Sequence, residues 1–158
     1  MTTPSTPDPS PANAGGLRVG STERAALEAA LAGEHAAVYA YGVVGGQAGS
    51  RYRPAASERL AWHSRQREIL SAQLVAAGVE PQPGAPAYAL PFPVTGVTDA
   101  RRLAAHVEQS LAATYADVVA AAPGPRRRAA ASLLAACAVQ ARRWGAVPHP
   151  FPGLPERQ

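Results

Sequence analysis

Residues Glu34-His35-Ala36-Ala37-Val38-Tyr39-Ala40-Tyr41-Gly42 place a carboxylate inside an apolar pattern that has helical spacing. With two leucines upstream, the residues of this pattern recur every three or four positions: Leu27, Leu31, Glu34, Val38 and Tyr41. This spacing predicts one face of an α-helix, turned toward the protein core. A charge on such a face is costly unless it is paired or binds a metal ion. The stretch therefore raises the question of which groups lie opposite Glu34.

The composition indicates one globular domain. The chain has 158 residues, of which 47% are hydrophobic, and no apolar run is long enough for a membrane helix of roughly 20 residues. All 15 basic residues are arginine, and the net charge is +4. That charge permits contact with nucleic acid, but the arginines are not interleaved with the aromatic residues that stack on single strands. We therefore expect neither a membrane span nor a nucleic-acid partner.

The single cysteine and the two chain ends bear on location. Cys137 cannot form a disulfide within the chain, so we expect a reducing, cytoplasmic environment. Residues 1–20 are rich in Pro, Ser, Thr and Gly and lack the segments of a secretory signal. We interpret them as a disordered leader, and residues 147–158, with four prolines, as an irregular tail.

Residues 21–146 are expected to form one bundle of four helices. Cap and breaker residues predict these helices near residues 21–44, 54–77, 99–122 and 125–145. Between the second and third helices, residues 79–98 carry five prolines, which exclude a helix, together with apolar residues that favour burial. The connections are therefore short, long and short. This order predicts an all-α, ferritin-like four-helix bundle with a Pro-rich crossover.

Each predicted helix carries a polar residue on its apolar face. These residues are Glu34, His63 with Arg67, Glu108, and Gln140. A di-iron carboxylate site needs a Glu on each of two helices and a Glu-x-x-His pair on each of the other two. The second helix has Leu60 where that pair needs Glu, and the fourth has neither Glu nor His at its centre. We therefore expect a buried network in which Arg67 and His63 neutralise Glu34 and Glu108.

Metal binding remains the alternative for the same region. Glu34, His63 and Glu108 are the residues that could hold iron or manganese, and no cofactor is expected under the leading interpretation. Cys137 is predicted to face inward without a neighbouring histidine, which favours an inert thiol over a nucleophile. We expect no catalytic residues.

A second candidate site is Arg126-Arg127-Arg128, at the start of the fourth predicted helix. Cations at a helix N-terminus oppose the helix dipole. The cluster is interpreted mainly as a solvated patch, and otherwise as a site for an anion or an acidic partner.

Three stretches together resemble an actinobacterial ferritin-like domain of unknown function. They are residues 34–42, His63 with Arg65 and Arg67, and Tyr88-Ala89-Leu90-Pro91-Phe92-Pro93-Val94. The resemblance covers about residues 21–145 and implies a ferritin-like four-helix bundle without an established reaction. Ferritin-like proteins include iron oxidases and oxygenases, from whose ligand pattern this sequence departs in its second and fourth helices.

We therefore expect a non-catalytic structural or interaction module whose metal site is replaced by a buried Glu/His/Arg network. The alternative is a degenerate di-metal oxidoreductase, and a third interpretation is a weak binder of nucleic acid or an acidic partner. Alanine-rich helix surfaces favour pairing into a homodimer.

Overall fold

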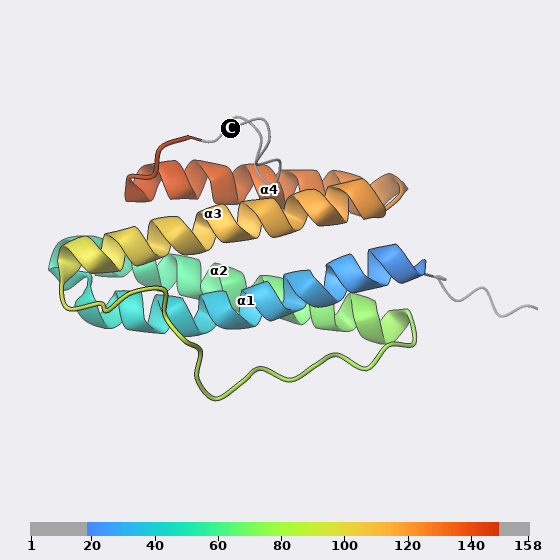
Figure 1. Ribbon diagram of the computed structural model, residues 1–158, viewed down its shortest axis with the longest axis horizontal. Coiled ribbons are helices and arrows are strands. Elements are labelled where there is room, and N and C mark those ends of the chain that lie inside the picture. Colours follow the sequence, from blue (N-terminus) through green and yellow to red (C-terminus); the bar gives the residue numbers. More distant parts are fainter. Residues whose placement is uncertain (1–18, 149–158) are drawn as a thin grey trace, which may run out of the picture.

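The computed structural model describes residues 19–148, and within this range the chain forms four α-helices and no β-strand. The helices are α1 (Ser21–Gln47), α2 (Gly49–Ala76), α3 (Val97–Ala121) and α4 (Gly124–Trp144). They form a bundle in which α1 packs on α2 and α3, and α3 packs on α4 (Figure 1). The predicted all-α four-helix fold is confirmed. None of the four helices is long and apolar enough to cross a membrane.

The predicted leader (1–20) and tail (147–158) lie almost entirely outside the described residues.

The helices form two antiparallel pairs, α1 with α2 and α3 with α4 (Figure 1). Because α2 and α3 run in the same direction, the chain between them must return along the bundle. Residues 77–96 make this return as an irregular crossover (Figure 1). Helix α2 has 28 residues and is therefore about 42 Å long, which an extended segment of this size can span.

The turn between α1 and α2 is much tighter than predicted. Only Ala48 separates the two helices, and Gly49 has a φ of +63°, a left-handed conformation that glycine adopts without strain. Helix α1 continues through Gly45 and Gly46, where a stop was predicted, and α2 begins five residues before Pro54. The expected start of the second helix at residue 54 was therefore wrong. Gly145, with a φ of +107°, ends α4 as predicted.

The core consists of two apolar clusters, one toward each end of the bundle. One contains Leu27, Leu31 and Tyr115, and the other contains Tyr41 and Trp144. Along α1, Leu31 belongs to the first cluster and Tyr41 to the second, with the buried Glu34 between them in sequence. The apolar core is thus divided by a layer that contains buried charge.

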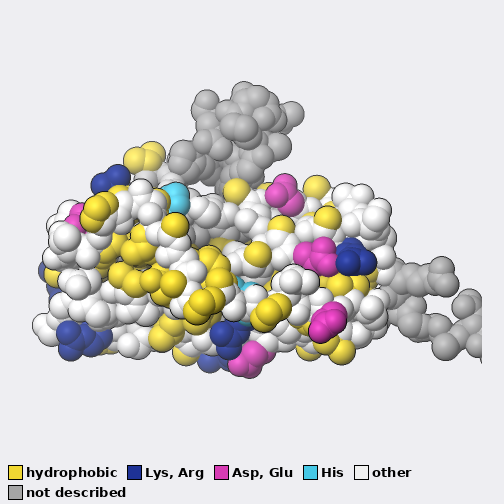
Figure 2. Space-filling model, turned by 60° about the horizontal axis from the view of Figure 1, so that its bottom comes forward, with side chains coloured by type: hydrophobic (Ala, Val, Ile, Leu, Met, Phe, Trp, Pro, Cys, Tyr) yellow, Lys and Arg dark blue, Asp and Glu magenta, His cyan; other side chains and the backbone are white. Residues whose placement is uncertain are grey.

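The crossover lies against the bundle and is anchored along its length. Leu90, Phe92 and Val94 are partly buried against the second cluster, and Figure 2 shows hydrophobic side chains gathered on this face of the molecule. Nearer its start, His35 Nε2 donates to the carbonyl oxygen of Gln82 at 3.2 Å. Gly84 passes so close that a Cβ there would lie 2.7 Å from His35 Nδ1. The start of the crossover is therefore fixed to α1.

Candidate functional site

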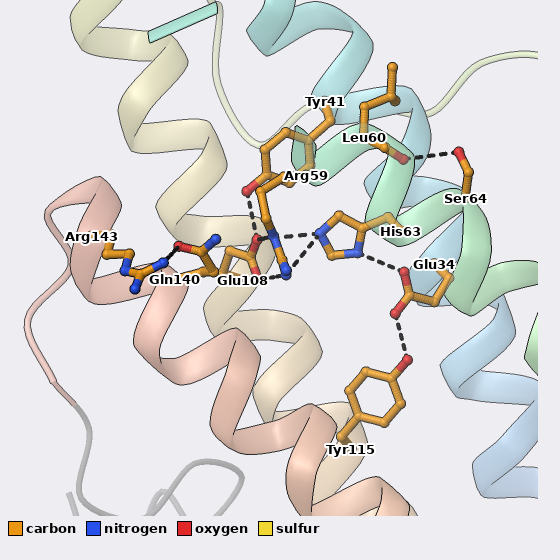
Figure 3. A network of polar contacts seen from close by, with 10 residues as sticks. All are labelled: Glu34, Tyr41, Arg59, Leu60, His63, Ser64, Glu108, Tyr115, Gln140 and Arg143. Atoms are coloured by element: carbon orange, nitrogen blue, oxygen red, sulfur yellow. Dashed lines mark hydrogen bonds and ion pairs between the residues drawn. The ribbon is translucent and has the colours of Figure 1, made fainter. Parts of the chain in front are cut away.

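The polar layer is built from α1, α2 and α3. Glu34 from α1, His63 from α2 and Glu108 from α3 are completely buried, and Arg59, one turn before His63, is 5% exposed. Figure 3 shows these side chains pointing toward one another between the helices. The sequence places them there because each belongs to the buried face of its helix.

Glu108 is held by an arginine and a tyrosine. Arg59 donates from Nε to Oε1 and from Nη2 to Oε2 of Glu108, both at 2.8 Å. This is the two-pronged geometry in which a guanidinium binds a carboxylate most strongly. The hydroxyl of Tyr41 also donates to Oε1, at 2.6 Å. Both oxygens of Glu108 are therefore occupied.

Glu34 is held in a similar way, by a histidine and a tyrosine. His63 Nδ1 lies 2.7 Å from Oε2 of Glu34, and the hydroxyl of Tyr115 donates to Oε1 at 2.5 Å. The other ring nitrogen of His63, Nε2, lies 3.3 Å from Oε1 of Glu108. The imidazole thus lies between the two carboxylates, and Nε2 is also 3.4 Å from Nη2 of Arg59.

This arrangement raises the pKa of His63. Burial lowers the pKa of His63, but hydrogen bonds to Glu108 and Glu34 outweigh that effect and raise the pKa above its ordinary value. Burial raises the pKa of Glu108, but hydrogen bonds from His63 and Arg59 outweigh it and hold the pKa below its ordinary value. With His63 as imidazolium, the two cations balance the two carboxylates, Glu34 and Glu108.

Aromatic rings enclose the two cations. The Arg59 guanidinium lies over the ring of Trp62, 3.9 Å from its centroid. The ring of Tyr41 stacks on the imidazole of His63, with the centroids 5.1 Å apart, and the Trp62 ring meets that imidazole edge-on at 4.9 Å. Burial raises the pKa of Tyr41 and of Tyr115, and the neighbouring carboxylates add to this effect, so both hydroxyls stay protonated and remain donors.

Two residues predicted for this network lie elsewhere. The side chain of Arg67 is 33% exposed, and it lies 3.8 Å from the carboxylate of the surface residue Glu68. Gln140 is partly buried, and its Oε1 accepts a 3.5 Å hydrogen bond from Arg143 on the same helix (Figure 3). The role assigned to Arg67 is filled by Arg59, on the opposite side of His63 along α2.

The residues proposed as metal ligands are already engaged with protein cations. Glu34, His63 and Glu108 do meet, but the guanidinium of Arg59 occupies both oxygens of Glu108. Across residues 19–148, no group of three or more His, Cys, Asp or Glu side chains is arranged to hold a metal ion. Cys137 is completely buried, and burial raises the pKa of its thiol, which suits a core residue rather than a ligand or a nucleophile.

The chain matches a known family over most of its length. Residues 26–156 match the model described as Domain of unknown function (DUF4439). The chain belongs to this family. The solved structures include a close relative of this DUF4439 protein, described as a conserved hypothetical protein, rv2844, from Mycobacterium tuberculosis.

The two proteins share 36% sequence identity, and the match covers 79% of this chain and 96% of the relative, with a TM-score of 0.77. No curated protein matches the chain.

The arginine cluster of this DUF4439 protein is largely engaged in structural contacts. Arg126 forms an ion pair with Glu23 of α1, whose side chain is 5% exposed. Arg127 donates from Nε to the carbonyl oxygen of Ala122 at 2.8 Å, at the end of the preceding helix. Arg128 is exposed. The cluster therefore joins α4 to α1 and α3 at the end of the bundle where α4 begins.

Three members of the polar layer were missed in the sequence: Arg59, Tyr41 and Tyr115. Arg59 precedes His63 by four residues, so helical spacing alone places both on one face. Tyr41 was placed on the apolar face of the first helix, and Tyr115 shares the face of Glu108 seven residues on. Buried tyrosine hydroxyls usually find a hydrogen-bond partner. The sequence therefore contained the information needed to include all three residues in the network.

Proposed function

We propose that this DUF4439 protein is a ferritin-like bundle that serves as a non-catalytic structural or interaction module. The two antiparallel helix pairs, joined by one long crossover between the parallel helices α2 and α3, support the ferritin-like assignment. The composition of the polar layer supports the second part of the proposal.

The observation that carries the proposal is the pairing of Arg59 with Glu108. Di-iron bundles use inward carboxylates to neutralise and bridge two metal ions. Here the guanidinium of Arg59 provides the positive charge at Glu108, and the imidazole of His63 links Glu108 to Glu34. Both oxygens of each carboxylate already have a protein donor. The layer therefore suits a structural role better than the alternative, a degenerate di-metal oxidoreductase.

Metal analysis of the purified protein tests this proposal. The protein would be produced with iron and manganese in the medium, purified without chelators, and then titrated anaerobically with Fe²⁺ and Mn²⁺. We expect substoichiometric metal and an unchanged melting temperature. Stoichiometric metal in the wild-type protein that is lost in Glu34→Ala would overturn the proposal in favour of the metal-binding alternative.

A matched pair of variants sharpens the result. Arg59→Met removes the guanidinium from Glu108, whereas Arg67→Met removes an arginine from the same helix outside the polar layer. If Arg59 replaces a metal ion, any gain of Mn²⁺ binding should be confined to Arg59→Met. Equal metal binding in both variants would show that Arg59 does not control access to the carboxylates.

A second copy of the chain is the partner that we propose for the interaction role. Large aliphatic side chains are exposed on α2 and α4, namely Ile69, Val75 and Val139. Sedimentation equilibrium of the wild-type protein and of Val75→Glu tests this point. A monomer at all concentrations would contradict the homodimer.

A further inference from the structure

A basic groove lies at the end of the bundle where α3 begins and α4 ends. It is bounded by the crossover, α3 and the residues that follow α4, and its volume is about 760 Å³. Its walls include Pro91, Phe92, Arg101, Arg102, Trp144 and Val147. This volume falls in the range of small-molecule sites. The groove shares no residue with the layer around Glu108.

Two arginines in this groove form no ion pair with the part of the chain that the structure describes. Within residues 19–148, neither Arg101 nor Arg102 has a carboxylate oxygen within 4 Å, in contrast to Arg59 and Arg126. The Nε atom of Arg101 is also buried without a hydrogen-bond partner in that range. Asp99, the nearest acid in sequence, accepts hydrogen bonds from the backbone and hydroxyl of Thr95. A buried donor without a partner is costly, and an added acceptor would relieve that cost.

Both guanidiniums are held against aromatic rings. Arg101 lies over Tyr52 at 5.0 Å from the ring centroid, and Arg102 lies over Phe92 at 4.0 Å. A ring restricts the guanidinium on one face but leaves the N–H groups along its edge free to donate. The two side chains are therefore oriented in advance, which reduces the entropy lost on binding.

The charge at this end of the bundle favours an anionic ligand. Six arginines lie within the first six residues of α2 and α3 and the last six of α4: Arg51, Arg53, Arg101, Arg102, Arg142 and Arg143. Asp99 is the one acidic residue in the same segments. Figure 2 agrees, since most acidic side chains visible on that face lie toward its right half, away from the start of α3. Such a field attracts anions toward the groove.

We propose that this groove binds a small organic phosphate through Arg101 and Arg102. A phosphate monoester carries a charge of about −1.5 to −2 at pH 7, which matches two guanidiniums better than a single carboxylate does. The groove is much larger than a phosphate group, and Pro91, Ala105 and Val147 provide apolar surface for an organic body.

Calorimetric titration of the full chain with phenyl phosphate, inorganic phosphate and benzoate tests the proposal. We expect phenyl phosphate to bind more tightly than the other two, and more weakly as salt increases. In NMR spectra of the same titration, the largest changes in backbone amide chemical shift should occur near Ala105 and Val147. Benzoate binding as tight as phenyl phosphate would overturn the phosphate assignment. The absence of binding, or shifts concentrated at the other end of the bundle, would overturn the site.

Matched double variants provide the control. Arg101→Gln with Arg102→Gln should weaken phenyl phosphate binding by about tenfold or more, because both charge-assisted contacts are lost. Arg65→Gln with Arg128→Gln removes the same charge from exposed positions outside the groove and should change the affinity by less than about twofold. Equal losses of affinity in the two double variants would mean that phenyl phosphate is attracted by the net charge of the protein and not by the groove, which would overturn the site. Should the first pair fail to fold, Arg102→Gln alone, at an exposed residue, should still weaken binding severalfold relative to Arg128→Gln.

Discussion

Arg59 holds Glu108 through two hydrogen bonds of equal length, 2.8 Å each, with the arginine side chain 6% exposed and the glutamate side chain completely buried. Such a pair contributes little net stability when intact, because burying both charges is costly. Removing one partner, by contrast, lowers the stability strongly, because the other charge is then left in the core without compensation. The polar layer should therefore be sensitive to single substitutions.

Arg59→Ala should lower the free energy of unfolding by about 3–5 kcal/mol, because it leaves Glu108 buried without its main cation. Urea denaturation followed by circular dichroism would measure the change. Arg67→Ala is the matched control on the same helix. Its side chain is 33% exposed and its pair with Glu68 is a surface pair, so we expect a change within about 0.5 kcal/mol. Similar losses in the two variants would contradict the assignment of Arg59.

Stability should depend on pH through His63 and Glu108. The pKa of His63 is raised in the folded protein, so its contribution is complete below the unfolded value of about 6.5 and is lost as the pH rises through the folded pKa. The pKa of Glu108 is lowered, so its contribution is complete above the unfolded value of about 4.3 and is lost as the pH falls through the folded pKa. The maximum should lie between these limits.

Urea denaturation from pH 5 to pH 9.5 would test the alkaline part of this profile. His63→Gln should remove most of the loss above pH 6.5, whereas His106→Gln, at an exposed position on α3, should retain it. An alkaline loss of the same size in His63→Gln would assign the effect to another group.

Tyr115→Phe should destabilise the protein by about 1.5–3 kcal/mol, the range for hydrogen bonds to charged groups. The substitution leaves Oε1 of Glu34 without its donor while the ring remains in the core. Thermal and urea unfolding would measure the loss. Tyr52→Phe serves as the control, because the Tyr52 ring is partly buried but its hydroxyl makes no hydrogen bond within residues 19–148. A neutral Tyr115→Phe would mean that Glu34 does not need this donor.

Replacing either of two glycines of α1 by alanine should change the stability of the protein by different amounts. A Cβ at Gly42 would meet nothing within 4 Å, so Gly42→Ala should stabilise the helix by about 0.5–1 kcal/mol. A Cβ at Gly33 would lie 2.9 Å from Cδ2 of Leu111, which is buried and must shift. Gly33→Ala should therefore be less stable than Gly42→Ala by about 1 kcal/mol or more. Equal gains, measured by urea unfolding, would show that Leu111 moves without cost.

The four helices and the long crossover could be predicted because their signals are local. Breakers such as Gly78 and Gly145 mark helix ends, and proline density marks the crossover. Glu34, His63 and Glu108 were also predictable as buried residues, since helical spacing assigns each to an apolar face. The arginine of the network was predicted wrongly: only Arg67 was considered, although Arg59 also lies four residues from His63 and shares its face.

The start of α2 explains why Arg59, and not Arg67, reaches Glu108. Helices α2 and α3 start at the same end of the bundle (Figure 1), and Glu108 lies eleven residues beyond Val97. Arg59 lies ten residues beyond Gly49, whereas Arg67 lies eighteen beyond it, about 12 Å further along the axis. With the expected starts at residues 54 and 99, Arg59, Glu108 and Arg67 lie five, nine and thirteen residues into their helices, so the two arginines are at equal distances from the level of Glu108. Helical spacing alone therefore could not show that Arg59 is the arginine that reaches Glu108.

The arrangement of the polar layer has a consequence for how the two halves of the bundle fit together. Glu34 and His63 belong to the first helix pair, whereas Glu108 and Tyr115 belong to the second. Most of the interface around them consists of alanine and leucine, and such a surface resembles itself after a shift of one helical turn, about 5.4 Å. A slip of that size would separate Glu108 from Arg59, Tyr41 and His63, which would leave this carboxylate in the core without a partner. Glu34 would lose Tyr115 but keep His63. We infer that the buried charges set the register of the two hairpins. Several alignments would pack almost equally well, but only one of them pairs Glu108 with Arg59.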